Sequence, residues 1–495
     1  MQKSSCVLNI FYRSSRVLAP LGLIMCACLA AGCSNLPKVD SPVGATLTPR
    51  AVPTAQAIQA AQVAPPVQLE GANGLLSPQQ TKAVLKKISR RAPETNIFEW
   101  HLALEESIAP TRLVVGNRVV LLQDGPATYK AMQQVIKQAK DHINMETYII
   151  EDDEIGRDFS KLLIEKQQAG VQVNLIYDSV GSVNTPRAFF DHLKENGINV
   201  LEFNPVNPLL AKKGWQINQR DHRKLLIVDG HTAILGGVNI SAVYSGGSAG
   251  HRAAPKLDAQ KTDAPKVPWR DTDMQISGPV VANFQKLFME TWAKQQGATL
   301  AEKKYFPIID HQGGEVIRAI GSSSDDALPQ MYTTLISAIN NAETAVSMTI
   351  AYFVPDPQLL DALKAAVKRG AEVKVILPSQ TDSSLVFHAG RSYYTGLLKN
   401  GIKIYERREK LLHSKTVLID GVWSTVGSTN LDWRSFLHND ELNAVVLGTD
   451  FGAQMNAMFN QDLAGSDEIT LEQWRQRGLV ERLKETAARV WAYWL

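Results

Sequence analysis

Two stretches of the chain carry the same set of reactive residues at the same spacing. Residues 222–239 read HRKLLIVDGHTAILGGVN, and residues 413–430 read HSKTVLIDGVWSTVGSTN. In each stretch a histidine is followed by a lysine two positions later and by an aspartate five positions after that. A Gly-Gly or Gly-Ser pair and an asparagine complete the pattern. Because the whole pattern recurs at identical offsets, it predicts a duplicated catalytic half-site.

The aliphatic and β-branched run inside each motif predicts a buried strand. Side chains two positions apart on a strand share a face, so His222 and Lys224 are expected to point into one pocket. His413 and Lys415 have the same relationship in the second motif. In both motifs the asparagine follows small residues that let the backbone approach a ligand closely. These asparagines are Asn239 and Asn430.

Two imidazoles, two ammonium groups and two amides form an anion site, and phosphate is its natural occupant. Phosphoryl transfer needs positioning and charge neutralisation, which such groups supply without a metal. Two histidines also permit covalent catalysis, in which one attacks phosphorus and the other transfers protons.

Paired histidines could instead bind a metal, but the chain has no HExxH sequence and no cysteine near either motif. The lysines would also repel a cation. We therefore expect no metal and no other cofactor. Asp229 and Asp420 belong to the predicted catalytic set, although their position at strand ends before glycine favours an orienting role over proton transfer.

The repeat extends well beyond the motifs. Strands and helices alternate in the same order in both parts of the chain, which indicates α/β architecture with a mixed sheet in each half. Three pairs of residues illustrate the alignment: Met145 with Met348, Gly170 with Gly370, and Gly197 with Gly401.

The doubled HxKx4Dx6G[GS]xN pattern resembles the signature of the phospholipase D superfamily, over roughly residues 110–465. The strings NMETYI, GSTNLDWRSF and NDELNAVV are most similar to bacterial cardiolipin synthases. The resemblance implies two pseudo-symmetric α/β/α halves with one shared active site at their interface. It also implies that His222 is the nucleophile and that His413 is the general acid and then the base.

A third correspondence concerns two acids. Counting back seven positions from Gly278 and from Gly448 reaches Asp271 and Glu441. An acid there could bond the distal nitrogen of a catalytic histidine and hold its tautomer; alternatively, both could be exposed loop charges. The resemblance implies that each acid serves the opposite half, pairing Asp271 with His413 and Glu441 with His222.

Residues 1–33 have the features of a secretory signal, with a basic flank and an apolar run of 15 residues (17–31) that is short for a membrane span. The run ends in Ala30-Ala31-Gly32-Cys33, which resembles a bacterial lipoprotein signal with Cys33 as the lipidated residue. Leu29 lies one position further from the cysteine than usual, and an uncleaved anchor is the alternative. The serine after Cys33 resembles outer-membrane sorting, so we expect an envelope lipoprotein that faces the periplasm.

The remaining chain divides by composition. We expect a flexible Pro/Ala-rich tether at 34–76, a helical lead-in at 77–110 that starts at Ser77-Pro78, a first half at 111–300, a second half at 301–465 and an amphipathic C-terminal helix at 466–495. Residues 240–268 contain an insert without counterpart in the second half, expected to be a mobile loop. All four cysteines lie in the first 33 residues, so disulfides play no part in the fold.

Charge and apolar patterning restrict the partners. A formal charge of +3 over 495 residues is too small to indicate a nucleic-acid binder. Two segments suit a bilayer interface because they place apolar and Trp side chains beside basic ones. They are residues 207–216 (Leu209, Leu210 and Trp215 around Lys212 and Lys213) and the last helix (Leu479, Leu483, Val490, Trp491 and Trp494). The alternative for the last helix is packing onto the core.

The chain is therefore expected to be a membrane-tethered phosphatidyltransferase that makes cardiolipin from phosphatidylglycerol, with phosphatidylethanolamine as a further possible lipid substrate. A phospholipase D that hydrolyses membrane lipid differs only in the acceptor. A nuclease of the same superfamily and an inactive lipoprotein scaffold are further alternatives. The tether and modest charge disfavour the nuclease, and two intact motifs disfavour the scaffold.

Overall fold

The computed structural model describes Leu36 and residues 67–89, 97, 101–102, 105, 111–211, 215–216, 218–246, 267–326 and 329–492. The proposed lipidation site Cys33, the apolar run before it, most of the predicted tether and residues 247–266 of the insert lie outside this range. Lys212 and Lys213 lie outside it as well.

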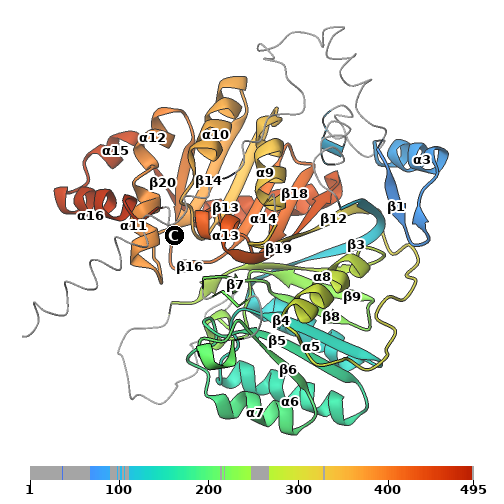
Figure 1. Cartoon of the computed structure of the whole chain (residues 1–495). Helices are drawn as coiled ribbons and strands as arrows, with labels where there is room; N and C mark the ends of the chain where they lie inside the picture. Colours follow the sequence, from blue (N-terminus) through green and yellow to red (C-terminus); the bar gives the residue numbers. More distant parts are fainter. Residues whose placement is uncertain are drawn as a thin grey trace, which may run out of the picture. The chain divides into compact units, whose positions relative to one another are not determined.

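Two mixed half-sheets meet edge to edge and repeat the same strand order outwards from the junction (Figure 1). The first half-sheet runs outwards as β3 (Leu113–Gln123), β11 (Thr272–Ser277), β9 (Thr232–Gly236), β8 (Leu225–Val228), β4 (His142–Thr147), β5 (Gln172–Asp178) and β6 (Asn199–Phe203). The second runs as β12 (Glu315–Ser322), β19 (Asn439–Leu447), β18 (Trp423–Gly427), β17 (Lys415–Ile419), β13 (Ala345–Ile350), β14 (Glu372–Pro378) and β15 (Lys403–Arg407), with β20 (Ser466–Ile469) at its edge. Antiparallel pairing of β3 with β12 joins the halves.

In both half-sheets the three outer strands of the repeat, β4–β5–β6 and β13–β14–β15, are parallel, and the others are antiparallel. Parallel neighbours need helical crossovers. In the first half these crossovers are α6 (Glu154–Gln168) and α7 (Arg187–Glu195), and the half also contains α5 (Asp124–Gln138) and α8 (Val281–Lys294). In the second half the crossovers are α10 (Pro357–Arg369) and the pair α11 (Ser384–Arg391) and α12 (Tyr394–Lys399). The second half also contains α9 (Gln330–Asn340), α13 (Trp433–Leu437) and α14 (Thr449–Ala464).

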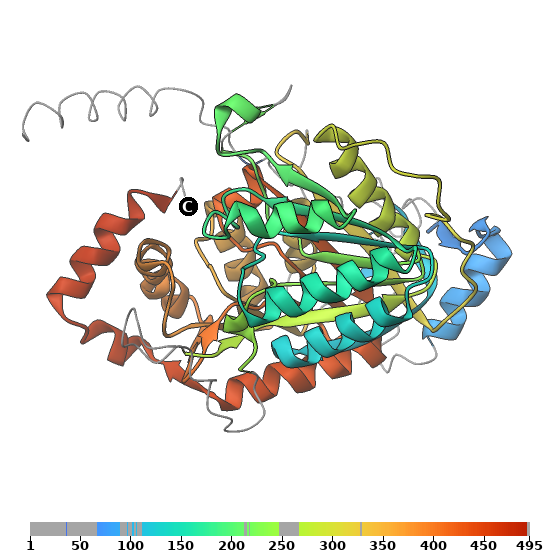
Figure 2. The same ribbon diagram turned by 90° about the horizontal axis from the view of Figure 1, so that it is seen from below.

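Two cores hold these layers together. α5, α6 and α7 cover the outer face of the first half-sheet through a cluster that includes Phe159, Leu163 and Phe190 (Figures 1 and 2). A second cluster packs α8 and α14 with strands of both halves, and it includes Phe284 from α8 and Phe451 from α14. Because this second core draws on both halves, they form one packed body. The predicted fold class, with its two pseudo-symmetric halves, is confirmed.

The structure differs from the predicted boundaries at both ends. Residues we placed in the tether form β1 (Leu69–Gly71) and β2 (Gly74–Leu75), and β1 pairs with β3. The helix predicted to begin at Ser77-Pro78 is α3 (Pro78–Ser89). The prediction of one helix over 466–495 is wrong. That segment starts with strand β20 and continues as α15 (Leu471–Arg475) and α16 (Leu479–Arg489), because β20 pairs with the open edge of β15.

None of the described helices is long and apolar enough to cross a membrane.

Asp229 and Asp420 occupy equivalent hairpin turns after β8 and β17, each with positive φ (54° and 52°). The Asp229 carboxylate accepts hydrogen bonds from the backbone N–H groups of residues 140, 141 and 142, at the start of β4. Asp420 does the same for residues 343, 344 and 345 at the start of β13, and it also bonds His101 Nε2 at 3.0 Å. Each aspartate therefore lies at the far end of its strand from the motif histidine, where it stabilises the fold.

Asp420→Asn is expected to destabilise the protein by about 2–3 kcal/mol at neutral pH. Burial alone would raise the pKa of Asp420, but the bonds from His101 and the backbone lower it to about 2. A carboxyl whose pKa falls on folding stabilises the fold above its unfolded pKa and loses that effect as pH falls through the folded pKa. Denaturant unfolding between pH 7 and pH 2 should show the two proteins converging as the pH decreases. A difference that stays constant over this range would contradict the assignment.

Candidate active site

Short parallel strand pairs between the halves deliver the two histidines. β7 (Arg220–Asp221) pairs with the start of β19, and β10 (Trp269–Arg270) pairs with β16 (Leu411–Leu412). The next residue continues each pairing. His222 N–H donates to the carbonyl of Asp440 at 2.9 Å, and His413 N–H donates to the carbonyl of Arg270 at 2.8 Å. Each motif histidine is thereby placed beside an acid of the opposite half.

In the first pair, His222 Nδ1 lies 3.1 and 3.0 Å from the two carboxylate oxygens of Glu441. Two further donors hold this carboxylate: Ser428 Oγ bonds Oε2 at 2.5 Å, and Asn439 Nδ2 bonds Oε1 at 3.1 Å. Because Nδ1 is engaged by the carboxylate, Nε2 is the ring nitrogen left for chemistry.

In the second pair, His413 Nδ1 lies 2.6 Å from Asp271 Oδ2, and Asp271 Oδ1 accepts from Thr272 N–H at 2.8 Å. A Cβ on Gly237 would lie 2.2 Å from Asp271 Oδ1, so glycine is required at that position. The equivalent position in the second motif is Ser428, whose hydroxyl bonds Glu441. Each motif histidine therefore lies within hydrogen-bond distance of the acid of the opposite half, as predicted.

The two lysines are buried beside their histidines. Lys224 Nζ donates to the carbonyl of His222 at 2.5 Å and lies 5.0 Å from the centre of the Tyr148 ring. Lys415 donates to the carbonyl of His413, and its ammonium is 2.9 Å from His413 Nδ1. Burial lowers the pKa of Lys224 to about 7 and also lowers that of Lys415. An anionic ligand that pairs with both lysines would favour their charged forms.

Burial likewise holds the imidazoles neutral. It lowers the pKa of His222 to about 4, although the Glu441 carboxylate acts to raise it. Burial and the nearby Lys415 charge lower the pKa of His413. Near neutral pH, His222 therefore carries a lone pair on Nε2 while Nδ1–H is bonded to Glu441, which is the form that a nucleophile needs.

The two motif asparagines do not have equivalent surroundings. Asn239 Oδ1 accepts from Ile149 N–H at 3.1 Å and Nδ2 donates to Tyr244 OH at 2.9 Å, so its amide supports the site walls. Asn430 Oδ1 is buried without a hydrogen-bond partner among the described residues. The structure brings the histidines, lysines, Asp271 and Glu441 together, and it leaves Asp229 and Asp420 at the far strand ends.

Several site residues were not predicted. The ring of Tyr148 packs 5.0 Å from that of His222, centre to centre, and Trp269 and Tyr244 pack 5.0 and 5.8 Å from His413. Tyr244 OH also lies 3.3 Å from His413 Nδ1. Tyr148 follows directly after a repeat strand, a position from which a side chain can reach the site. For Tyr244 and Trp269 only the fold supplies the signal, because they flank the insert that has no counterpart in the second half.

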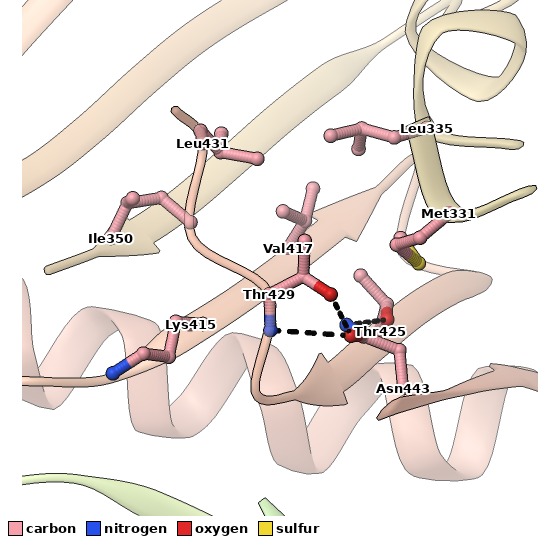
Figure 3. A pocket seen from close by; sticks show the side chains of 9 residues that line it. All are labelled: Met331, Leu335, Ile350, Lys415, Val417, Thr425, Thr429, Leu431 and Asn443. Carbon is pink, nitrogen blue, oxygen red and sulfur yellow. Dashed lines mark hydrogen bonds between the residues drawn. The ribbon is translucent and has the colours of Figure 1, made fainter. Parts of the chain in front are cut away.

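A small cavity lies behind Lys415, next to the second motif (Figure 3). Its volume of about 10 Å³ admits at most one water molecule. Asn443 accepts hydrogen bonds from Thr429 and donates to Thr425 on its wall, and the Lys415 ammonium points away from this cluster. The side chains of the cavity wall stabilise the turn at Thr429, and the cavity itself is not a substrate pocket.

Within the part of the chain that the structure describes, no three His, Cys, Asp or Glu side chains are grouped so as to hold a metal ion.

Comparison with known proteins agrees with this geometry. Residues 132–244 and 335–463 match the family model described as "Cardiolipin synthase, PLD-like domain". The chain belongs to the phospholipase D superfamily and is an enzyme of its phosphatidyltransferase kind.

Among its relatives, a protein named cardiolipin synthase from Halalkalibacterium halodurans is 32% identical over 78% of this chain and 74% of its own length. Cardiolipin synthase A of Pseudomonas syringae is 33% identical over 79% of this chain and 82% of its own length. The crystal structure of phosphatidylserine synthase from Haemophilus influenzae covers 84% of this chain and 100% of its own, with a TM-score of 0.56 and 12% identity, and supports the fold.

Replacing Glu441 by Gln is expected to lower kcat by about 10²–10⁴-fold, because His222 loses the carboxylate that fixes its tautomer and stabilises its positive charge. The same carboxylate raises the pKa of His222, so removing it should move the acid limb of kcat/KM to lower pH. The measurement is a pH–rate profile with the melting temperature as a check on folding. The control is Asp467→Asn, which changes an exposed acid paired with Arg408 and should leave kcat and the acid limb of kcat/KM unchanged. An acid limb that does not move would show that Glu441 does not act through His222.

Proposed function

We propose that the chain is a cardiolipin-forming phosphatidyltransferase that works through a phosphohistidine intermediate. The observation that carries the proposal is the single site in which two buried histidines from separate halves are each bonded to an acid of the other half. The names of the relatives, cardiolipin synthases 32–33% identical over more than three quarters of the chain, support the choice of substrate.

In the first step, His222 Nε2 attacks the phosphorus of phosphatidylglycerol. The N–P bond forms as the bond to the glycerol oxygen breaks, and His413 Nε2–H gives its proton to that oxygen. The approach of the anionic diester favours the protonated form of His413, because negative charge stabilises an imidazolium. Asp271 on Nδ1 stabilises the same charge. Glycerol leaves, and a phosphatidyl group remains on His222.

In the second step, His413 acts as the base. It takes the proton from a hydroxyl of a second phosphatidylglycerol as that oxygen attacks phosphorus, and the N–P bond to His222 breaks. The products are cardiolipin and the starting enzyme. Lys224 and Lys415 neutralise the phosphate oxygens in both steps, which is the main source of rate enhancement available to such a site. Water in place of the second lipid would give hydrolysis.

We further propose that the enzyme is tethered to the membrane through lipidated Cys33 and faces the periplasm, with the outer membrane favoured. The support is sequence alone: small residues precede Cys33 at the end of a short apolar run. Intact mass of the expressed protein tests this, and a mature chain that retains residues 1–32 would contradict it.

Purified protein is expected to convert phosphatidylglycerol vesicles into cardiolipin and glycerol, with full activity in EDTA because lysines occupy the positions that a metal would need. Lipid products resolved by mass give the answer, and phosphatidylethanolamine vesicles show whether a second donor is used. Phosphatidic acid as the only product would make the enzyme a hydrolase. The absence of any lipid product would overturn the proposal.

The same assay, stopped with a denaturing detergent at neutral pH because acid hydrolyses the N–P bond of a phosphohistidine, tests the covalent step. His413→Ala should accumulate a phosphatidyl adduct on His222 when the donor carries an aryl leaving group, because that group needs no proton while the acceptor still needs a base. Turnover should remain at least ~10²-fold low. Peptide mass locates the adduct. An adduct on His413 in the reciprocal His222→Ala variant, with none on His222 in His413→Ala, would reverse the roles.

A further inference from the structure

Helix α16 packs against the protein with its small side chains and exposes its large ones. Ala488 and Ala492 are buried against Val354 and Ala389, and Glu485 is buried in an ion pair with Arg477. In contrast, five large apolar residues of this helix and the turn after it are between 40% and 77% exposed. They are Leu479, Val480, Leu483, Val490 and Trp491, called here the docking face.

The docking face is one continuous stripe. Successive residues of a helix are rotated by about 100°, so its five members fall within about one third of the circumference, together with the exposed Ala487. The buried residues Glu485, Ala488 and Ala492 fall on the opposite side. An amphipathic helix that served only the core would have the reverse arrangement. Packing onto the core therefore explains the alanines of α16 and leaves its large apolar side chains unexplained.

The helix that carries the docking face packs on an element at the active-site end of the sheet. α16 packs on α11, which follows the carboxyl end of β14 (Figure 1). The carboxyl ends of β4–β5–β6 and of β13–β14–β15 are called here the catalytic edge, because Tyr148 after β4 contacts His222 and Tyr352 after β13 contacts His413. A recess of about 20 Å³ between Tyr352, Thr381 and α11 residues connects α11 with this edge.

The first half exposes apolar side chains at its own part of the catalytic edge. Val180 and Val183 follow β5, and Val206, Leu209 and Leu210 follow β6, with Leu209 90% exposed. Parallel strands end at the same edge of a sheet, so these loops lie on the side where Tyr148 meets His222. Both halves thus present apolar side chains around one site.

The charges around the docking face indicate whether a bilayer or a second copy of the chain would cover it. Three basic residues of α16 are exposed, Arg482, Lys484 and Arg489, whereas the acid Glu481 is half-buried and pairs with Lys484. Basic residues along the flanks of an apolar stripe that ends in Trp match the interfacial region of an anionic bilayer. A second copy of the chain would bring the same basic residues together.

We propose that the docking face inserts into the interfacial region of an anionic phospholipid bilayer and, with the apolar loops after β5 and β6, holds the catalytic edge against the lipids. This inference rests on the proposed function, because it takes the substrates to be lipids of that bilayer. It adds a membrane contact near the C-terminus that is separate from any attachment through Cys33. Its role is to bring the phosphodiester of the lipid headgroup within reach of the histidines, and not only to attach the protein to the membrane.

The test compares full-chain protein with the double variant Leu479→Glu/Leu483→Glu. The substrates are vesicles of long-chain phosphatidylglycerol and water-soluble monomers of dihexanoyl phosphatidylglycerol. The matched control, Leu75→Glu/Ile308→Glu, changes two residues with 57% and 74% exposure that lie beside the start of β3 and the β8–β9 turn, away from the catalytic edge. A separate readout is quenching of Trp491 fluorescence by brominated acyl chains, with Trp491→Phe as its blank.

We expect the double variant to turn over vesicles about tenfold or more slowly, because two leucines inserted into the bilayer would contribute strongly to interfacial binding. Turnover of the monomeric lipid should stay within about twofold, and the control should keep both activities. Trp491 should be quenched in the wild type. Unchanged vesicle turnover together with absent quenching would overturn the docking face, and so would equal losses on both substrates. A dimer dissociated by the double variant, with vesicle turnover retained, would assign the face to a second copy. Quenching without any lipid product from the wild type would overturn the proposed function and leave the docking face supported.

Discussion

The two imidazole–carboxylate bonds across the interface of the halves are the constraint on which the site depends. Each histidine is presented by its own motif but oriented by an acid of the other half, His222 by Glu441 and His413 by Asp271. Neither half alone contains an oriented histidine. The backbone enforces this exchange, because β7 pairs with β19 and β10 with β16 immediately before the residues concerned. The duplicated fold thus makes a single active site obligatory.

Two buried arginines next to the catalytic residues also bond across the same interface. Arg270, just before Asp271, pairs with Asp462 of α14 at 2.7 Å, and Arg223, just after His222, bonds the carbonyls of Ser322 and Glu441. These contacts tie the backbone of each half to the other beside the catalytic groups. Since truncating one partner of a buried ion pair leaves the other charge uncompensated, disruption here should weaken the fold and the site together.

The halves are alike in topology and different in detail. Gly237 leaves room for the short side chain of Asp271, whereas Ser428 at the equivalent position donates to the longer Glu441. Tyr244 and Trp269 crowd His413, while Tyr148 lies beside His222 and over Lys224. The two histidines thus have distinct surroundings, as a mechanism with two distinct histidine roles requires. The C-terminal elements after β20 belong to the second half only and place an apolar surface beside the catalytic edge.

The motifs, the alternation of strands and helices, the α/β class and the pairs of equivalent residues could all be predicted from the amino-acid sequence, because they follow from local periodicity and from a pattern repeated at constant spacing. The sequence also located Asp271 and Glu441 by register. The place of Asp229 and Asp420 at strand ends before glycine indicated an orienting role. The groups that their carboxylates bond, the N–H groups at the start of β4 and β13, were visible only in the folded chain, since φ and long-range partners are not encoded in spacing. The folded chain was also needed to show that residues 466–469 extend a sheet edge and that α16 turns its alanines inward and its leucines outward. The apolar pattern of a helix does not specify which neighbouring element covers its apolar side chains.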